Sequence, residues 1–318
     1  MEGPIAVSVV VASHARELRL RWLLNALEEQ TFDEPWELVI VHDYDPPTSE
    51  RVIERHPIAG QRSVRAMHGD GGPGRRRNTG WRAARGELVA FIDDDCRAEP
   101  DWLERLVAIA RQHPGHVIQG RTRPDPFEEQ VLKAPHVRTL DIVPVNSYRE
   151  TCNILYPREL LERLEGFDER AITGEDVDLS LRALAAGAQI NAAPDALAYH
   201  AIESFTLPGI LRVNLKWRHL AYLVKRHPEL RSEFPLGIFW DEEHMLVTAA
   251  AVGVLGASRH PWLLALAAPY VRKASRRRGR GRRARALALA ELPGQATRQL
   301  AEVLGMAAGS VRHRTLLL

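Results

Sequence analysis

Short apolar runs alternate with amphipathic segments from the N-terminus to about residue 200. Residues 5–12 and 36–41 are β-rich apolar runs, and leucines recur at helical spacing between Leu20 and Leu27. A strand, a helix and a strand in this order predict a right-handed parallel unit with both following loops at one edge of a sheet. The remaining strands are expected at residues 63–67, 88–92, 117–121, 151–156, 189–193 and 196–200, and the remaining helices at residues 49–55, 75–85, 100–112, 158–164 and 178–186.

The pattern becomes helical in the last third of the chain. Residues 210–226 are amphipathic, and a last helix is expected near residues 295–308. Between them, residues 245–257 and 262–271 are apolar, but neither stretch reaches the roughly 20 residues that a membrane-spanning helix needs. The pattern therefore predicts helices that pack in a soluble unit or lie at a membrane surface.

An α/β domain over residues 1–205, with a mostly parallel sheet flanked by helices, is expected to precede a helical extension over residues 206–318. The chain of 318 residues is long enough for this arrangement, and its formal net charge is only +2. Cys96 and Cys152 cannot form a disulfide framework or a cysteine zinc site, and they fit buried thiols in a reducing compartment. The N-terminus has no secretory signal, so we expect a cytoplasmic protein.

A dense basic run, residues 272–285, follows the second apolar stretch. One interpretation is a re-entrant or interfacial hairpin, with Trp262 and Tyr270 at the depth of the lipid headgroups and the arginines against anionic lipid. The other is a helical pair packed on the rest of the protein, with solvated arginines. We favour peripheral contact with an anionic membrane, at its inner face, through residues 245–285. A nucleic-acid partner is not expected, since no aromatic stacking platform accompanies the arginines.

Three carboxylates, Asp93, Asp94 and Asp95, follow directly after the expected strand at residues 88–92. Open α/β sheets bind ligands at the carboxyl ends of their strands. Carboxylates about 4 Å apart repel by roughly 1 kcal/mol in water and about 4 kcal/mol at a protein surface, so the cluster needs a compensating cation. Mg²⁺ or Mn²⁺, completed by substrate phosphates, is one candidate. A solvated acidic turn that caps the next helix is the alternative.

A glycine-rich loop, residues 68–74, leads into a helix whose first turn carries Arg75, Arg76 and Arg77. Glycines allow close backbone approach, a helix N-terminus offers free N–H groups, and arginines bind phosphates, so a diphosphate would fit here. An ordinary connector with solvated arginines has the same composition. The strand that leads to the acids follows at once, which favours the diphosphate.

Six motifs then occur in a fixed order, namely VSVVVASH, VHDYD, GRRRNTGWRAARGELVAFIDDD, TCNILYPRELLERLEGFDE, GEDVDLSLR and AYH. This ordered set resembles glycosyltransferase family 2, enzymes of the Rossmann-like GT-A fold that use a nucleotide-diphosphate sugar as donor. The resemblance implies a donor half at about residues 1–98 and an acceptor half at about residues 99–205. It also implies metal-dependent transfer, with inversion, to a hydroxyl of a lipid-linked or cell-envelope glycan, as in polysaccharide biosynthesis.

The resemblance implies a role for each candidate residue on the donor side. Ala12 and Ser13 would line the nucleotide, and Asp43 would bind its base. The remaining candidates are Arg77, Asp93 and Asp94 for the donor, and Asp95 and His200 for Mn²⁺ or Mg²⁺. Outside this family context, a lone histidine after an apolar strand is more often structural.

The acceptor side carries the expected catalytic base, Asp176. An acceptor hydroxyl must lose a proton as it attacks the anomeric carbon, while the departing diphosphate gains charge that a metal can neutralise. The resemblance implies that Asn153 binds the acceptor and that Glu175 orients either the acceptor or the base. Asp178 is expected to cap its helix. Without the family context, these acids would simply complement a helix dipole.

The chain departs from the family in the loop that follows Asp43, where residues 44–47 read YDPP in place of the frequent Gly-Ser. The base and the sugar of the donor are therefore not specified by the motifs. Two other functions are considered. A sugar nucleotidyltransferase would need a glycine-rich loop after the first strand, and ASHARE is not one. A non-catalytic, membrane-associated protein that retains the fold is disfavoured by the intact Asp93, Asp95 and Asp176.

Overall fold

The computed structural model describes residues 4–279 and 281–318. The chain forms two compact units. The α/β unit comprises the chain up to Lys133 together with Arg138–Glu203, and the helical unit comprises Ala134–Val137 and Ser204–Leu318. The short strands β7 (Val137–Arg138) and β10 (Glu203–Ser204) lie where the chain passes between the units. A short segment near the middle of the chain thus belongs to the helical unit, which the sequence pattern did not predict.

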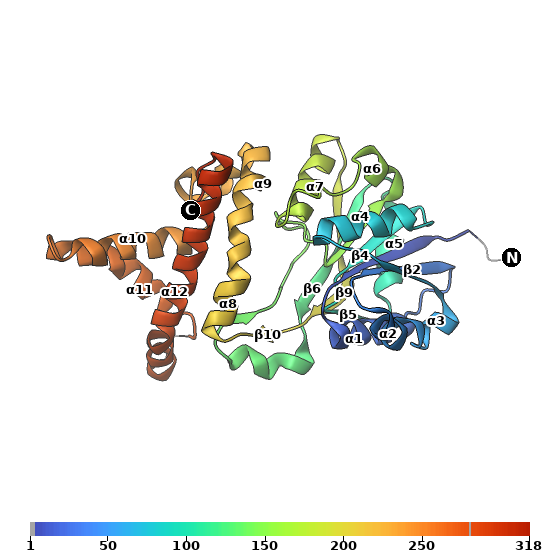
Figure 1. Cartoon of the computed structure of the whole chain (residues 1–318), viewed down its shortest axis with the longest axis horizontal. Helices are drawn as coiled ribbons and strands as arrows, with labels where there is room; N and C mark the ends of the chain where they lie inside the picture. Colours follow the sequence, from blue (N-terminus) through green and yellow to red (C-terminus); the bar gives the residue numbers. More distant parts are fainter. Residues whose placement is uncertain (1–3, 280) are drawn as a thin grey trace. The chain divides into compact units, whose positions relative to one another are not determined.

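An eight-stranded sheet forms the α/β unit (Figure 1), with the strand order β3-β2-β1-β4-β8-β6-β9-β5. The strands are β1 (Val7–Ser13), β2 (Trp36–His42), β3 (Ser63–His68), β4 (Leu88–Ile92), β5 (Cys96–Ala98), β6 (Val117–Pro124), β8 (Asn153–Pro157) and β9 (Ile190–His200). Strands β3, β2, β1 and β4 are parallel, as are β6 and β9. Strand β8 runs antiparallel between β4 and β6, and β5 runs antiparallel to β9.

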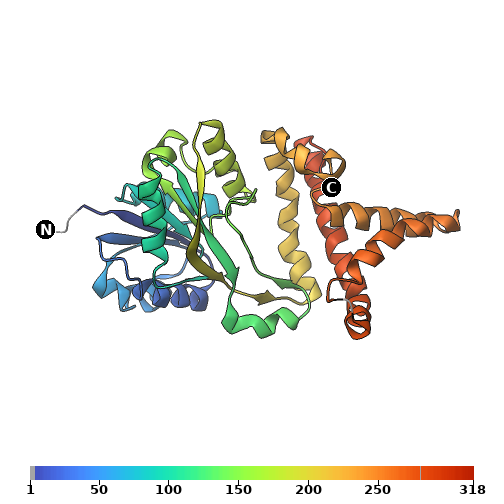
Figure 2. The ribbon, with the colours of Figure 1, turned by 180° about the vertical axis from the view of Figure 1, so that it is seen from behind.

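Helices cover both faces of this sheet, as Figures 1 and 2 show. They are α1 (Glu17–Glu28), α2 (Pro46–Ser49), η1 (Glu50–Glu54), α3 (Ile58–Gln61), α4 (Pro73–Ala83), α5 (Trp102–Gln112), α6 (Arg158–Arg163) and α7 (Glu175–Ala185). The segment η2 (Pro126–Lys133) has no buried residue and does not cover the sheet. One core contains α1 and α5, and the other contains α4, α6 and α7. Along β1, Val9 and Val11 lie in the first core and Val10 in the second, because side chains alternate along a strand.

The two strands expected at residues 189–193 and 196–200 are one continuous strand, β9. Pro194 and Asp195, which lie between the two expected strands, are accommodated by a register shift against β6, between Gly120 and Arg121. A bulge of this kind accommodates a proline without ending the strand.

The helical unit contains nine helical segments in its described residues. They are α8 (Leu207–Asn214), η3 (Leu215–His219), α9 (Leu220–Arg226), η4 (Pro228–Glu233), η5 (Pro235–Gly237), α10 (Glu242–Gly256), η6 (Pro261–Ala267), α11 (Ala268–Ala274) and α12 (Arg282–His313). The single helix expected at residues 210–226 is therefore divided by a 3-10 turn. A buried ionic cluster stabilises the unit: Glu302 of α12 binds His244 of α10 at 3.0 Å and Asn214 of α8 at 2.6 Å.

Two predictions for the helical unit were wrong. The last helix was expected near residues 295–308, yet α12 begins at Arg282, continues through Pro293 and Gly294, and spans 32 residues. Tyr270 was expected at lipid headgroup depth, but its ring is buried in the unit and its hydroxyl donates to Gln299 at 2.7 Å. Among the described helices, none is both long and apolar enough to cross a membrane.

Candidate functional site

Three neighbouring parallel strands end at one edge of the sheet. Ser13, the last residue of β1, pairs with His42 at the end of β2, and β4 ends at Ile92, directly before the acids. Parallel strands carry their carboxyl ends to the same edge, so the segments that follow them converge there. The structure thus brings together the predicted residues Ala12, Ser13, Asp43, Asp93, Asp94 and Asp95.

Asp94 is buried among groups from the loops after β1 and β2. Ser13 Oγ donates to Asp94 Oδ2 at 2.7 Å and lies 2.7 Å from the hydroxyl of Tyr44. Burial, and then the charge of Asp95, raises the pKa of Asp94 to about 6. Tyr44, which in the sequence was only a departure from the family pattern, is therefore part of the network that holds this edge.

Asp43 lies at the end of β2 and contacts two cationic or ionisable groups. Arg76 Nη2 donates to Asp43 Oδ2 at 3.0 Å, and the ring of His14 binds the same oxygen. Burial alone would raise the pKa of Asp43, but the bond from His14 and the charge of Arg76 lower it below its ordinary value. Asp43 is thus an ionised acceptor at the place where the family resemblance implies the nucleotide base.

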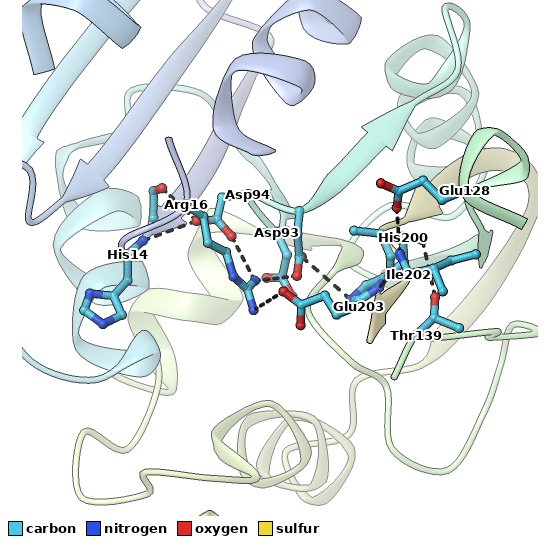
Figure 3. Close-up of polar contacts among 12 residues, drawn as sticks. His14, Arg16, Asp93, Asp94, Glu128, Thr139, His200, Ile202 and Glu203 are labelled. Carbon is cyan, nitrogen blue, oxygen red and sulfur yellow. Dashed lines mark hydrogen bonds and ion pairs between the residues drawn. The ribbon is translucent and has the colours of Figure 1, made fainter. Parts of the chain in front are cut away.

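Arg16 is a site residue that the sequence reasoning missed. Its guanidinium binds Asp95 Oδ2 closely, lies 3.3 Å from Asp94 Oδ1 and lies 3.7 Å from Glu203 (Figure 3). The chain itself therefore supplies a cation against its acid cluster. The sequence feature that could have indicated this role is an arginine only three residues after β1, in the loop that faces the acids.

Arg77 links the end of β4 to the start of α7. Its Nη2 donates to Asp93 Oδ1 at 2.7 Å and its Nη1 to Glu175 Oε1 at 2.8 Å, with only 8% of the side chain exposed. Gly80 allows this placement, because a Cβ there would lie 2.5 Å from Val10 Cγ1, so α4 packs closely on β1. Burial alone would raise the pKa of Asp93, but Arg77 offsets it and leaves that pKa below its ordinary value.

Asp176 lies in the first turn of α7, which begins after Gly174 in a left-handed conformation with φ of 79°. Its Oδ1 accepts from the N–H of Val177 at 2.9 Å. Burial, followed by the charge of Glu175, raises the pKa of Asp176 to about 8, although Arg77 opposes the shift. A carboxyl group that titrates near neutral pH can exchange a proton with a substrate hydroxyl.

The structure gives Asp178 and Asn153 structural contacts. Asp178 was expected to cap α7, but it lies within the helix and accepts from Arg182 at 2.8 Å. The buried amide of Asn153 accepts from Trp102 Nε1 at 2.8 Å and donates to the carbonyls of Arg121 and Ala196, both at 2.9 Å. Asn153 thus joins α5, β6 and β9, and these internal contacts give no support to a role in acceptor binding.

Asp95 and His200 offer two ligand atoms for a cation. Asp95 Oδ1 is buried without a hydrogen-bond partner and lies 3.7 Å from His200 Nε2. His200 Nδ1 faces the carbonyl of Ala201 at 2.8 Å, so in the neutral ring Nδ1 carries the proton and Nε2 keeps its lone pair. Within residues 4–279 and 281–318, no group of three or more His, Cys, Asp or Glu side chains is placed to hold a metal ion. The pair fits Mn²⁺ or Mg²⁺ only if substrate oxygens and water complete the shell.

The sequence of this chain is similar to those of several known proteins. Residues 8–164 match the family model described as Glycosyl transferase family 2. The succinoglycan biosynthesis protein ExoO of Rhizobium meliloti is 26% identical over 227 residues, which cover 66% of this chain and 64% of ExoO. Several other curated relatives match over shorter stretches, and the chain covers only 30% to 36% of their length.

Two solved structures share the fold. The mannosyltransferase PcManGT of Pyrobaculum calidifontis, in complex with GDP-Man and Mn²⁺, has a TM-score of 0.57 at 21% identity, covering 98% of this chain and 89% of its own. TarS of S. aureus, residues 1–349 in complex with UDP-GlcNAc, has a TM-score of 0.53 at 18% identity, covering 98% and 93%. At these identities the likeness concerns the fold, and it confirms the predicted sheet flanked by helices with a helical C-terminal part.

Proposed function

Because residues 8–164 belong to glycosyltransferase family 2 and the fold is of the GT-A type, we propose that this enzyme moves a sugar from a nucleotide-diphosphate donor to a hydroxyl of a cell-envelope or lipid-linked glycan. The main structural support for the proposal is the pair of contacts that Arg77 makes. It binds Asp93, on the donor side, and Glu175, the neighbour of the proposed base Asp176. The acceptor class is suggested by relatives such as ExoO. The family match favours transfer over the nucleotidyltransferase and non-catalytic alternatives.

Each side of the proposed reaction has its own residues. Asp43 and Ser13 would hold the nucleoside, and the N-terminus of α4 with the half-exposed Arg75 would attract the diphosphate. Asp95 and His200 would hold Mn²⁺ or Mg²⁺, and such an ion supplies positive charge that stabilises a departing diphosphate. Glu175 is engaged with Arg77, so we assign it to positioning.

The proposed chemistry is a displacement at the anomeric carbon. The acceptor oxygen forms the new bond to that carbon as its proton passes to the carboxylate of Asp176. The bond between the anomeric carbon and the donor phosphate oxygen breaks, and the nucleoside diphosphate leaves with the electron pair. A base on the face opposite the leaving group gives inversion of configuration.

Nucleotide binding tests the donor site directly. We expect that one of UDP, GDP, dTDP and CDP, with Mn²⁺, raises the melting temperature of the native chain, since a ligand at about 100 times its Kd stabilises by roughly 2.7 kcal/mol. Asp95→Ala should abolish the contribution of Mn²⁺, because it removes the unpartnered Oδ1. The control Asp195→Ala, at a carboxylate with 79% of its side chain exposed, should behave as the native chain. Absence of any nucleotide effect would contradict the proposed function.

The pH dependence of activity should report on Asp176. A base acts as the carboxylate, and its raised pKa of about 8 leaves it mostly protonated below that value. We therefore expect kcat/KM to rise with pH up to about 8 and to level off above it, because kcat/KM reports the free enzyme. Glu175→Gln removes a charge that raises this pKa and should move the inflection to lower pH. A flat profile between about pH 6 and about pH 9 would contradict Asp176 as the base.

Peripheral membrane contact through residues 245–285 is the second part of the proposal. Helix α10 and η6 form a hairpin in which Gly253 allows close approach, since a Cβ there would lie 2.5 Å from the carbonyl oxygen of Leu263. Several large apolar side chains of this hairpin are exposed, including Leu255 (80%) and Trp262 (71%). We call this set the hairpin ridge; its members are Val252, Val254, Leu255, Trp262 and Leu264.

The charges of the basic run, residues 272–285, suggest that the hairpin ridge binds an anionic surface. Part of the basic run is paired within the helical unit: Lys273 binds Glu242, Arg277 binds Glu243, and Arg278 binds Glu291 at 2.5 Å. Other members of the run, Arg272, Arg276, Arg282, Arg283 and Arg285, are exposed. Exposed apolar side chains and exposed arginines within the same unit match the two chemical features of an anionic bilayer surface, and each charge near such a surface contributes about 1 kcal/mol.

Vesicle binding tests the membrane proposal. The full chain should co-sediment with vesicles that contain phosphatidylglycerol and not with pure phosphatidylcholine vesicles. The double variant Leu255→Asp/Trp262→Asp should lose most of this binding. Val311→Asp, at an apolar side chain of α12 with 83% exposure, is the matched control and should bind as the native chain. Equal binding by all three proteins, or none by the native chain, would contradict the proposal.

A further inference from the structure

A groove with a cavity volume of about 670 Å³ lies beside the edge strand β5 in the α/β unit. Its walls come from α1, from the residues of β5 and those that follow it, and from η2. The lining residues that matter here are Trp22, Asn25, Glu29, Arg97, Glu99 and Phe127. None of the proposed donor, metal or base residues lines it, and its volume falls in the range of small-ligand sites, about 300 to 1,000 Å³.

Two aromatic side chains are exposed in this groove. Trp22 of α1 is 38% exposed and Phe127 of η2 is 83% exposed. The guanidinium of Arg97 lies 4.6 Å from the ring centre of Phe127 and equally 4.6 Å from that of Tyr199. Asp125 holds Arg97 through both carboxylate oxygens, each at 3.1 Å. Arg97 therefore contacts the Phe127 ring, which is still 83% exposed and accessible to a ligand.

The wall that carries Phe127 is fixed to the rest of the unit. Glu128, the next residue, accepts from Arg19 of α1 at 2.5 Å and from the N–H of Ile202 at 2.8 Å (Figure 3). Both oxygens of Glu128 are thus engaged, and η2 is tied to α1 on one side and to the segment after His200 on the other. A wall fixed by these two contacts of Glu128 needs little rearrangement to receive a ligand.

The chemistry of the lining selects the ligand class. A sugar ring has an apolar C–H face, which stacks on an aromatic ring, and a rim of hydroxyl groups, which need hydrogen-bond partners. Trp22 and Phe127 offer aromatic rings for stacking. Asn25 and the carboxylates of Glu29 and Glu99 offer hydrogen-bond partners for the hydroxyl groups. Those carboxylates would repel phosphate groups, which disfavours a nucleotide.

A second, smaller pocket relates the groove to the proposed metal residues. Trp22, Arg97 and Asp125 line both pockets, and the smaller one is also lined by Asp95 and Ala201. The groove is therefore adjacent to a small pocket that Asp95 helps to line. The groove thus lies near the proposed metal residue Asp95 but is separate from it.

We propose that this groove is a saccharide subsite that holds a neutral segment of the acceptor glycan, at a distance from the hydroxyl that reacts. The inference rests on the proposed function. Trp22 and Phe127 stack on sugar rings, and Asn25, Glu29 and Glu99 bind their hydroxyl groups.

Calorimetric titration of the full chain with cellopentaose, maltopentaose and chitopentaose tests the subsite without donor or metal. Saturable binding of at least one oligosaccharide is expected, weakened at least about tenfold, or 1.4 kcal/mol, by Trp22→Ala and by Phe127→Ala. Leu18→Ala, at an apolar side chain of the same helix α1 that is 60% exposed and does not line the groove, is the matched control and should bind as the native chain. Glu29→Gln should also weaken binding, and it tests the groove without loss of packing because Glu29 is exposed.

The outcomes separate this inference from the proposed function. Absence of binding by every oligosaccharide, or binding that survives both aromatic substitutions, would overturn the subsite. If the same preparations still show stabilisation by nucleotide with Mn²⁺, the transferase proposal stands without the subsite. If oligosaccharide binding depends on Trp22 while no nucleotide stabilises the chain, the groove stands as a glycan site and the transferase proposal fails.

Discussion

Asp176→Asn is expected to lower kcat by about 10²-fold to 10⁴-fold while nucleotide binding stays as in the native chain. The amide keeps the size of the carboxyl group and can still accept from the N–H of Val177, so α7 should retain its first turn. It cannot take the proton of the acceptor hydroxyl. Transfer assays with the nucleotide sugar chosen by the thermal-shift panel measure the loss.

The control for this variant is Asp195→Asn, which changes an exposed carboxylate of β9 and should leave kcat unchanged. Loss of nucleotide stabilisation in Asp176→Asn would point to a folding defect. A fully active Asp176→Asn protein would contradict the proposed base and would direct attention to Glu175, the neighbouring acid.

Arg77→Met is expected to have the largest effect on stability. It leaves Asp93 and Glu175 without their shared cation, and breaking a buried charge pair typically costs about 3 to 5 kcal/mol. Arg77→Lys should recover only part of this, because a single ammonium group cannot reproduce the forked contact with two carboxylates. The transition in which urea unfolds the α/β unit measures both losses as changes in the free energy of unfolding.

Arg75→Met is the matched control for Arg77. It lies in the same turn of α4, but 55% of its side chain is exposed, so its removal should change stability by less than about 0.5 kcal/mol. The double variant Arg77→Met/Glu175→Gln should be more stable than Arg77→Met alone, since it removes one uncompensated charge. Equal stability of the native chain and Arg77→Met would contradict the bridging role.

The sequence predicted the features that depend on local pattern. The strand that ends at Ile92 and the acids after it could be recognised, because a buried parallel strand is a continuous apolar run. The order of the motifs identified the family. The partners of Arg77 could not be predicted, since they depend on how closely α4 packs on β1 through Gly80, which is a property of the tertiary structure.

The remaining errors have two physical causes. The last helix was expected to begin near residue 295, whereas α12 continues through Pro293, because its packing in the helical unit outweighs the loss of one backbone hydrogen bond. Arg16 and Tyr44 lie in loops, where no periodicity indicates the direction of a side chain. Their contacts with Asp94 and Ser13 arise only after β1, β2 and β4 are assembled side by side.

The arginines that compensate the acid cluster also bear on how fast a donor can reach the site. Bare carboxylates at the sheet edge would repel an approaching diphosphate and slow the encounter. Arg16 and Arg77 counter Asp93, Asp94 and Asp95 before any ligand arrives, and the exposed Arg75 adds a charge that attracts an anion. Such a field raises association rates and fades as salt shortens its range, about 8 Å at physiological ionic strength. The cations that hold the unliganded edge together thereby also favour rapid capture of the donor.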